Sequence, residues 1–96
     1  MNSKQRSYLM SLAANQDAIF QVGKGGVSPT LVEGIDEALS TRELVKINVL
    51  KTSFEPLMQT ADTIAGRTHS EVVSVIGRKI ILYRPNPEKK NPIVLP

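Results

Sequence analysis

Cysteine and tryptophan are both missing from this chain of 96 residues. Without cysteine, the chain can form neither a disulfide framework nor a thiolate metal site. No apolar run approaches the roughly 18 residues that a membrane-spanning helix needs. The start, Met1 to Lys4, also lacks the apolar stretch of a signal peptide. We therefore expect one small cytoplasmic protein that does not associate with membranes.

Side chains suited to catalysis are equally scarce. The one histidine, His69, falls in an expected loop, and no further metal ligands stand at a suitable spacing. No motif surrounds any serine that would make it a nucleophile. The glycines of residues 23–26 match neither the dinucleotide-binding nor the P-loop pattern. The sequence thus predicts no enzyme, no cofactor, no metal and no small-molecule substrate.

Charge is distributed unevenly along the chain. Twelve Lys and Arg residues against nine Asp and Glu residues give a formal net charge of +3. Residues 1–66 carry six basic and seven acidic groups, a sum of −1, whereas residues 67–96 carry six basic and two acidic groups, a sum of +4. A basic excess of this kind favours an anionic partner, although a solvated surface with a basic tail would show it too.

Three segments place apolar residues at helical spacing, and each follows a serine that can cap a first turn. The clearest start is Ser28 followed by Pro29, whose missing N–H is harmless at the first helical position. Gly66 is expected to end the third helix. The three expected caps are Ser3, Ser28 and Ser53.

Four further segments are rich in β-forming residues. In the second of them Val45, Ile47 and Val49 alternate with polar residues, which predicts a strand with one buried and one partly wet face. Gly77-Arg78 is typical of a tight hairpin. The segments are residues 18–22, 43–51, 72–76 and 79–84.

The order αβαβαββ predicts an α/β fold: a mixed four-stranded sheet packed with three helices. No repeat or linker divides the chain. We expect a single domain over residues 1–85 and a Pro-rich basic tail over residues 86–96 that is poorly structured.

Gly23-Lys24-Gly25-Gly26 forms a G-x-x-G turn directly before the second helix. Glycine lacks a Cβ, so a sugar-phosphate backbone can approach the main chain closely, and N–H groups of the turn and the helix start can face it. Lys24 adds a positive charge. KH domains clamp nucleic-acid backbone with a loop of this type. Taken alone, the turn is also compatible with an ordinary strand-to-helix connection.

Aromatic residues number only two Phe and two Tyr. Phe20 and Phe54 are expected in or beside the core, and the exposed aromatic platform of an RRM sheet is missing. Any RNA binding is therefore predicted to rely on phosphate and shape contacts, with little reading of bases.

Four segments stand in order along the chain: Gly23–Val27, Leu31–Leu39, Arg42–Ile47 and Val75–Pro85. Together they resemble the CRM domain (chloroplast RNA splicing and ribosome maturation), in its stand-alone bacterial, YhbY-like form. The resemblance covers about residues 3–85. It implies a fold similar to the C-terminal domain of translation initiation factor three, and association with precursors of the large (50S) ribosomal subunit.

RNA contact in the family is attributed to the G-x-x-G loop and to neighbouring basic surface. Carried onto this sequence, the resemblance implies RNA-binding roles for Gly23, Lys24, Gly25, Gly26, Lys46, Arg78, Lys79 and Arg84. The resulting hypothesis is an RNA-binding protein that contacts ribosomal RNA during 50S assembly. The alternative is a protein-interaction module that docks on a ribosomal protein or assembly GTPase through Glu33, Asp36 and Glu37.

Overall fold

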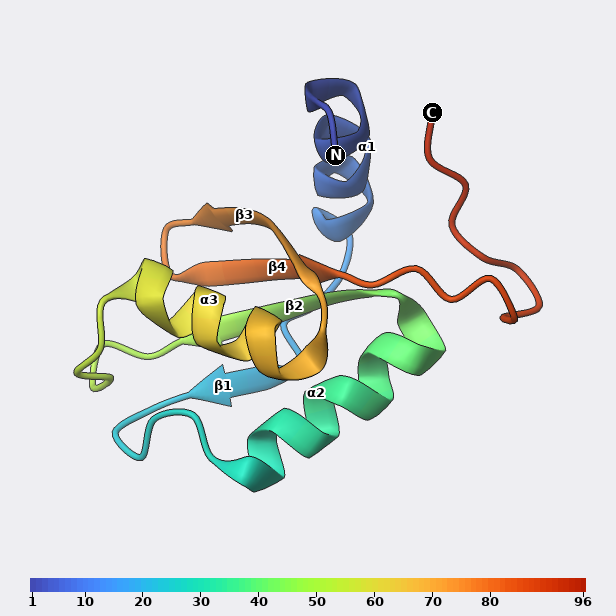
Figure 1. The fold of residues 1–96 in the computed structure, drawn as a ribbon. Helices are drawn as coiled ribbons and strands as arrows, with labels where there is room; N and C mark the ends of the chain where they lie inside the picture. Colours follow the sequence, from blue (N-terminus) through green and yellow to red (C-terminus); the bar gives the residue numbers. More distant parts are fainter.

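The computed structural model describes residues 1–96 and has the predicted order αβαβαββ. Its four strands form one sheet in the order β1-β2-β4-β3 (Figure 1), in which β1 runs parallel to β2 and the other neighbours are antiparallel. The α/β prediction with a mixed sheet is confirmed. The elements are α1 (Ser3–Ala13), β1 (Phe20–Val22), α2 (Pro29–Arg42), β2 (Leu44–Val49), α3 (Leu57–Thr68), β3 (Glu71–Ile76) and β4 (Lys79–Tyr83).

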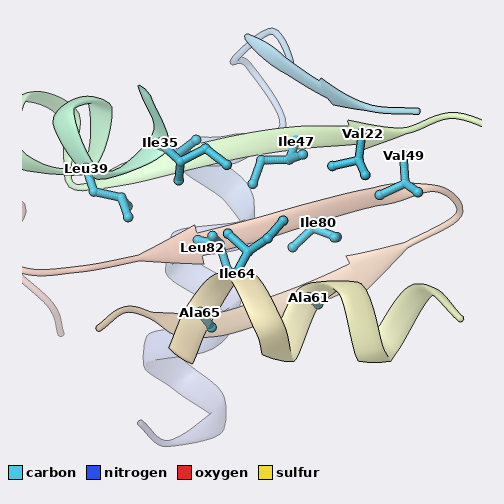
Figure 2. Close-up of a cluster of buried hydrophobic side chains, with 11 residues drawn as sticks. Val22, Ile35, Leu39, Ile47, Val49, Ala61, Ile64, Ala65, Ile80 and Leu82 are labelled. Atoms are coloured by element: carbon cyan, nitrogen blue, oxygen red, sulfur yellow. The ribbon is translucent and has the colours of Figure 1, made fainter. Parts of the chain in front are cut away.

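Two apolar clusters hold helices on the two faces of the sheet. The larger packs α2 and α3 against one face, where Ile47 and Val49 of β2 are buried (Figure 2). Val45 belongs to the same cluster, as the alternation of the strand predicts. The smaller places Leu9 and Ala13 of α1 against the opposite face. None of the three helices has the length and hydrophobicity that a membrane crossing requires.

The helix starts agree with the sequence prediction at α2 only. There the Ser28 hydroxyl accepts the backbone N–H of Leu31 at 3.1 Å, with Pro29 at the first helical position. The cap of α1 is Asn2 rather than Ser3, because Asn2 and Gln5 bond each other's backbone N–H groups in a capping box.

The prediction for α3 is wrong at both ends. Ser53 does not cap it, because the helix starts later, at Leu57 after Pro56. The Ser53 backbone N–H instead closes a turn onto the Leu50 carbonyl. The helix also continues through Gly66 to Thr68, whose buried hydroxyl bonds the Ile64 carbonyl at 2.8 Å. Chain reversal is left to His69, whose φ is +53°.

The strands are close to their predicted limits. β1 is shorter than expected and starts at Phe20, while Ile19 before it stays 41% exposed. Gly77-Arg78 joins β3 to β4 as a tight hairpin, and Gly77 adopts the positive φ of +59° that its turn requires.

Residues 86–96 contain no helix or strand, but they are not loose. The buried Glu43 carboxylate accepts the backbone N–H groups of Asn86 and Ile93, each at 2.8 Å. Ile93 and Leu95 pack against the α1 cluster. The expectation of a poorly structured tail thus holds for secondary structure but not for contacts.

Candidate nucleic-acid interface

Three loops meet at one edge of the sheet. Val22 of β1 is paired with Val49 of β2, and Asn48 of β2 with Lys79 of β4, so these strand ends lie side by side. The loops that leave them, residues 23–28, 50–56 and 77–78, gather at the same end of the molecule (Figure 1, left). We call these loops together with Lys79 the loop edge. Ligands of open α/β sheets commonly bind outside the carboxyl ends of parallel strands.

The G-x-x-G turn lies open to solvent at the loop edge. The Gly26 N–H bonds the Gly23 carbonyl at 3.0 Å, and Gly26 has a φ of +69°, which disfavours any other residue there. Gly25 is exposed, and a Cβ placed on it would meet nothing within 4 Å. Lys24 beside it is exposed as well. A phosphodiester group can therefore reach the main chain at Gly25 without displacing protein atoms.

Direct contacts connect the three loops. The Leu50 N–H donates to the Val22 carbonyl at 2.8 Å, and a Cβ on Gly23 would lie 3.4 Å from the Leu50 side chain. Arg78 donates from Nε to the Val49 carbonyl and from Nη2 to the Leu50 carbonyl, both at 2.7 Å. Arg78 thus positions the 50–56 loop and brings its charge to the same edge.

The electrostatics of the loop edge favour an anion. It carries four basic residues and one acidic residue, Glu55, so its charge of 4 − 1 = +3 equals that of the whole chain. The helices α2 and α3 both begin there without an acidic residue in the first turn, so the positive ends of their dipoles add to this potential. The basic residues are Lys24, Lys51, Arg78 and Lys79.

Lys46 lies in the middle of β2 on the α1 face, half-buried. Its Nζ donates to the carbonyls of Ala13 at 3.1 Å and Gln16 at 3.3 Å, where a cation complements the C-terminal end of α1. Lys46 and Lys79 both line a pocket of about 200 Å³ beside Met10 and Ile76. The lysine therefore borders the loop edge, with two of its three N–H donors used within the fold.

Arg84 follows the end of β4 that is opposite the Gly77-Arg78 hairpin, so the structure does not bring it to the loop edge. Its guanidinium donates to the Asp36 carboxylate, the Asp36 carbonyl, the Ser40 hydroxyl and the Thr68 carbonyl. These contacts tie β4 to both α2 and α3. They also neutralise Asp36, one of the three acidic residues that the protein-docking alternative depends on.

Two residues at the loop edge, Phe54 and Lys51, differ from what the sequence predicted for them. Phe54 is 84% exposed, so the expectation that it lies in or beside the core is wrong, whereas Phe20 does pack against the larger cluster. Lys51, absent from the predicted RNA-binding set, is exposed in the same loop as Phe54. Both residues follow β2, and Lys24 follows β1. Because the carboxyl ends of parallel strands lie at the same edge of a sheet, the predicted parallel pairing could have placed the two residues beside Lys24.

The chain belongs to the CRS1 / YhbY (CRM) domain family, whose sequence model matches residues 1–84. This agrees with the family resemblance seen in the sequence.

Individual members extend the comparison. The chain is 40% identical over 90 residues to "Probable RNA-binding protein YqeI" of Bacillus subtilis, covering 94% of both chains. It is 29% identical over 90 residues to a protein of Haemophilus influenzae named "RNA-binding protein", covering 94% of this chain and 91% of that protein. The solution structure of SAV1595 from Staphylococcus aureus superimposes with a TM-score of 0.82 at 45% identity, covering 100% of this chain and 99% of the other.

Proposed function

We propose that this protein binds RNA, and that the loop of residues 23–26 grips the phosphate backbone. The observation that carries the proposal is the solvent-open main chain at Gly25, set beside Lys24 in the loop edge, whose net charge is +3. The names of the Bacillus and Haemophilus relatives support the same partner.

The mechanism of binding follows from the loop edge. Backbone N–H groups of the turn can meet phosphate oxygens because no Cβ at Gly25 keeps them apart. Lys24, Lys51 and Lys79 supply charge that RNA binding would exchange for released counterions. Such contacts hold the backbone of many sequences alike, so the loop would supply affinity rather than base specificity.

We further propose ribosomal RNA of 50S precursors in the cytoplasm as the target. This step rests on the family resemblance, which associates stand-alone bacterial members with precursors of the large subunit. RNase treatment tests it against the protein-docking alternative: digestion of the RNA should release the protein from ribosomal particles. Retention after complete digestion would favour a protein partner.

The decisive test replaces the loop chemistry while keeping the fold. Lys24→Ala combined with Gly25→Asp removes a cation and puts a carboxylate where phosphate would bind, and Gly25 has room for the new side chain. We expect affinity for structured ribosomal RNA, measured by filter binding at fixed salt, to fall at least about tenfold.

A matched control makes the same change in charge elsewhere. Gly66 on α3 is exposed with no atom near its Cβ position, and Lys90 is exposed in the tail. Gly66→Asp with Lys90→Ala should therefore leave RNA affinity close to that of the unmodified protein. Equal affinity of the loop variant and the unmodified protein would overturn the proposed function.

A further inference from the structure

The Phe54 ring is the most exposed large apolar side chain of the molecule, at 84%. We propose that it stacks on an unpaired base of the RNA whose backbone lies on the Gly23–Gly26 loop. This inference rests on the proposed function and adds to it a base contact that phosphate binding alone does not include.

The segment carrying Phe54 is anchored on both sides. Before it, the Ser53 N–H bonds the Leu50 carbonyl at 3.1 Å, and Leu50 is itself bonded to β1 and to Arg78. After it, Pro56 has its φ fixed near −56° and leads directly into α3. The ring therefore projects from a short, tethered loop, so little conformational freedom is lost when it meets a ligand.

The surroundings of Phe54 suit a nucleotide better than an apolar protein partner. The three residues before it and the one after it are polar, namely Lys51, Thr52, Ser53 and Glu55, and Pro56 follows them. The adjoining glycine loop adds Lys24. Two further apolar side chains are exposed at this end of the molecule, Met58 on α3 at 54% and Ile76 before the β3–β4 hairpin at 51%. An exposed ring within a basic surface matches the combination of aromatic platform and cationic groove found in single-strand binding sites.

A single exposed ring also limits the kind of RNA that the site can bind. Bases within an A-form duplex are stacked and paired, so a single ring cannot reach their faces. Bases in loops, bulges and ends are open to aromatic side chains. The site therefore fits a backbone turn with an unpaired base, and it should prefer hairpin loops over uninterrupted duplex.

Fluorescence can observe the contact directly because the chain contains no tryptophan. Phe54→Trp introduces a single reporter whose emission should be quenched by an RNA hairpin with an unpaired loop, and much less by a blunt duplex of equal length. Val94→Trp is the matched control, since Val94 is 78% exposed in the C-terminal tail. Its emission should stay unchanged with either RNA.

Affinity provides the second readout. Phe54→Ala should weaken hairpin binding roughly five- to hundredfold, the range expected for one stacked base, and Phe54→Tyr should retain binding. Because the ring is uncharged, Phe54→Ala should leave the dependence of affinity on salt unchanged.

The outcomes separate the two proposals. An unquenched reporter and an unaffected Phe54→Ala variant, while the Lys24 and Gly25 double variant still loses affinity, would overturn the stacking contact alone. Unchanged affinity in both variants would overturn the proposed function and the stacking with it. A Phe54→Ala variant with full RNA affinity that no longer stays on ribosomal particles would assign the ring to a protein partner and also overturn the stacking.

Discussion

The Glu43 carboxylate accepts the backbone N–H of Ile93 at 2.8 Å, across fifty residues of chain. Glu43 has no exposed surface and sits between α2 and β2 with a φ of +65°. A buried acid is tolerated only when its oxygens are paired, and here Asn86 N–H and the Lys89 ammonium at 3.6 Å complete the pairing. One residue of the Arg42–Ile47 segment thus holds the C-terminal tail.

Glu43→Gln should detach part of the tail. The amide keeps the size of the side chain but offers one acceptor oxygen instead of two, so one of the two backbone N–H groups loses its partner. We expect the free energy of unfolding in urea to fall by about 1–3 kcal/mol, and the amides of Asn86 and Ile93 to exchange faster. Glu37→Gln, on the exposed surface of α2, should change neither measurement.

Removal of residues 86–96 should abolish the effect of that substitution. The shortened chain lacks the backbone N–H groups of Asn86 and Ile93 and the Lys89 ammonium, so water takes their place at the Glu43 carboxylate. Glu43→Gln should therefore change the stability of the shortened chain little while it destabilises the full one. Additive effects in this double-mutant cycle would contradict the role given to Glu43.

Arg84→Lys should lower stability without changing RNA affinity. Four N–H groups of the guanidinium reach acceptors on α2 and at the end of α3, and a lysine ammonium cannot span them. We expect a loss of about 1–3 kcal/mol in the free energy of unfolding, compared with almost none for Arg67→Lys on the exposed side of α3. Loss of RNA affinity at full stability would instead make Arg84 an RNA contact.

The dependence of RNA affinity on salt concentration should report how many phosphates the loop edge neutralises. If the four basic residues of the loop edge each neutralise one phosphate, the slope of log affinity against log salt should be about −3 for single-stranded RNA. Lys24→Ala and Lys79→Ala should each make the slope shallower by about 0.7. Lys90→Ala, in the tail, serves as the control and should leave it unchanged.

Stability should fall at alkaline pH through Tyr83. Burial, and secondarily the negative charge of Glu43, raise the pKa of its hydroxyl above the usual 10.0. Between the unfolded-state pKa of 10.0 and the higher folded-state pKa, Tyr83 keeps its proton in the folded state but releases it in the unfolded state. The contribution of Tyr83 to stability is therefore fully present below pH 10 and is lost as the pH rises through the folded-state pKa. The free energy of unfolding in urea, measured from pH 9 to 11, should fall less in Tyr83→Phe than in the unmodified protein. Tyr8, which is 39% exposed, provides the control, and Tyr8→Phe should show the same fall as the unmodified protein.

Patterns of neighbouring residues were sufficient to predict most of the fold. The alternation around Ile47 identified the buried face of β2, Ser28 and Pro29 identified the start of α2, and Gly77-Arg78 identified the hairpin. Each of these signals is local, since it depends on strand period, capping or turn chemistry within a few residues. The misplaced ends of α3 show the limit of such signals, because packing around Thr68 carried the helix past Gly66.

Only the tertiary structure decided which charged and aromatic side chains are free to meet a ligand. Lys46, Arg84 and Glu43 find their partners 33, 48 and 50 residues away in the chain, and no local pattern reports such contacts. Phe54 remained exposed for the complementary reason that no distant segment covers it. The sequence by itself determined the order of the elements and the glycine turn with its lysine. Strand pairing then placed that turn beside Arg78 and the 50–56 loop. Only the tertiary structure could decide this, because the partners of a side chain depend on which distant strands become neighbours.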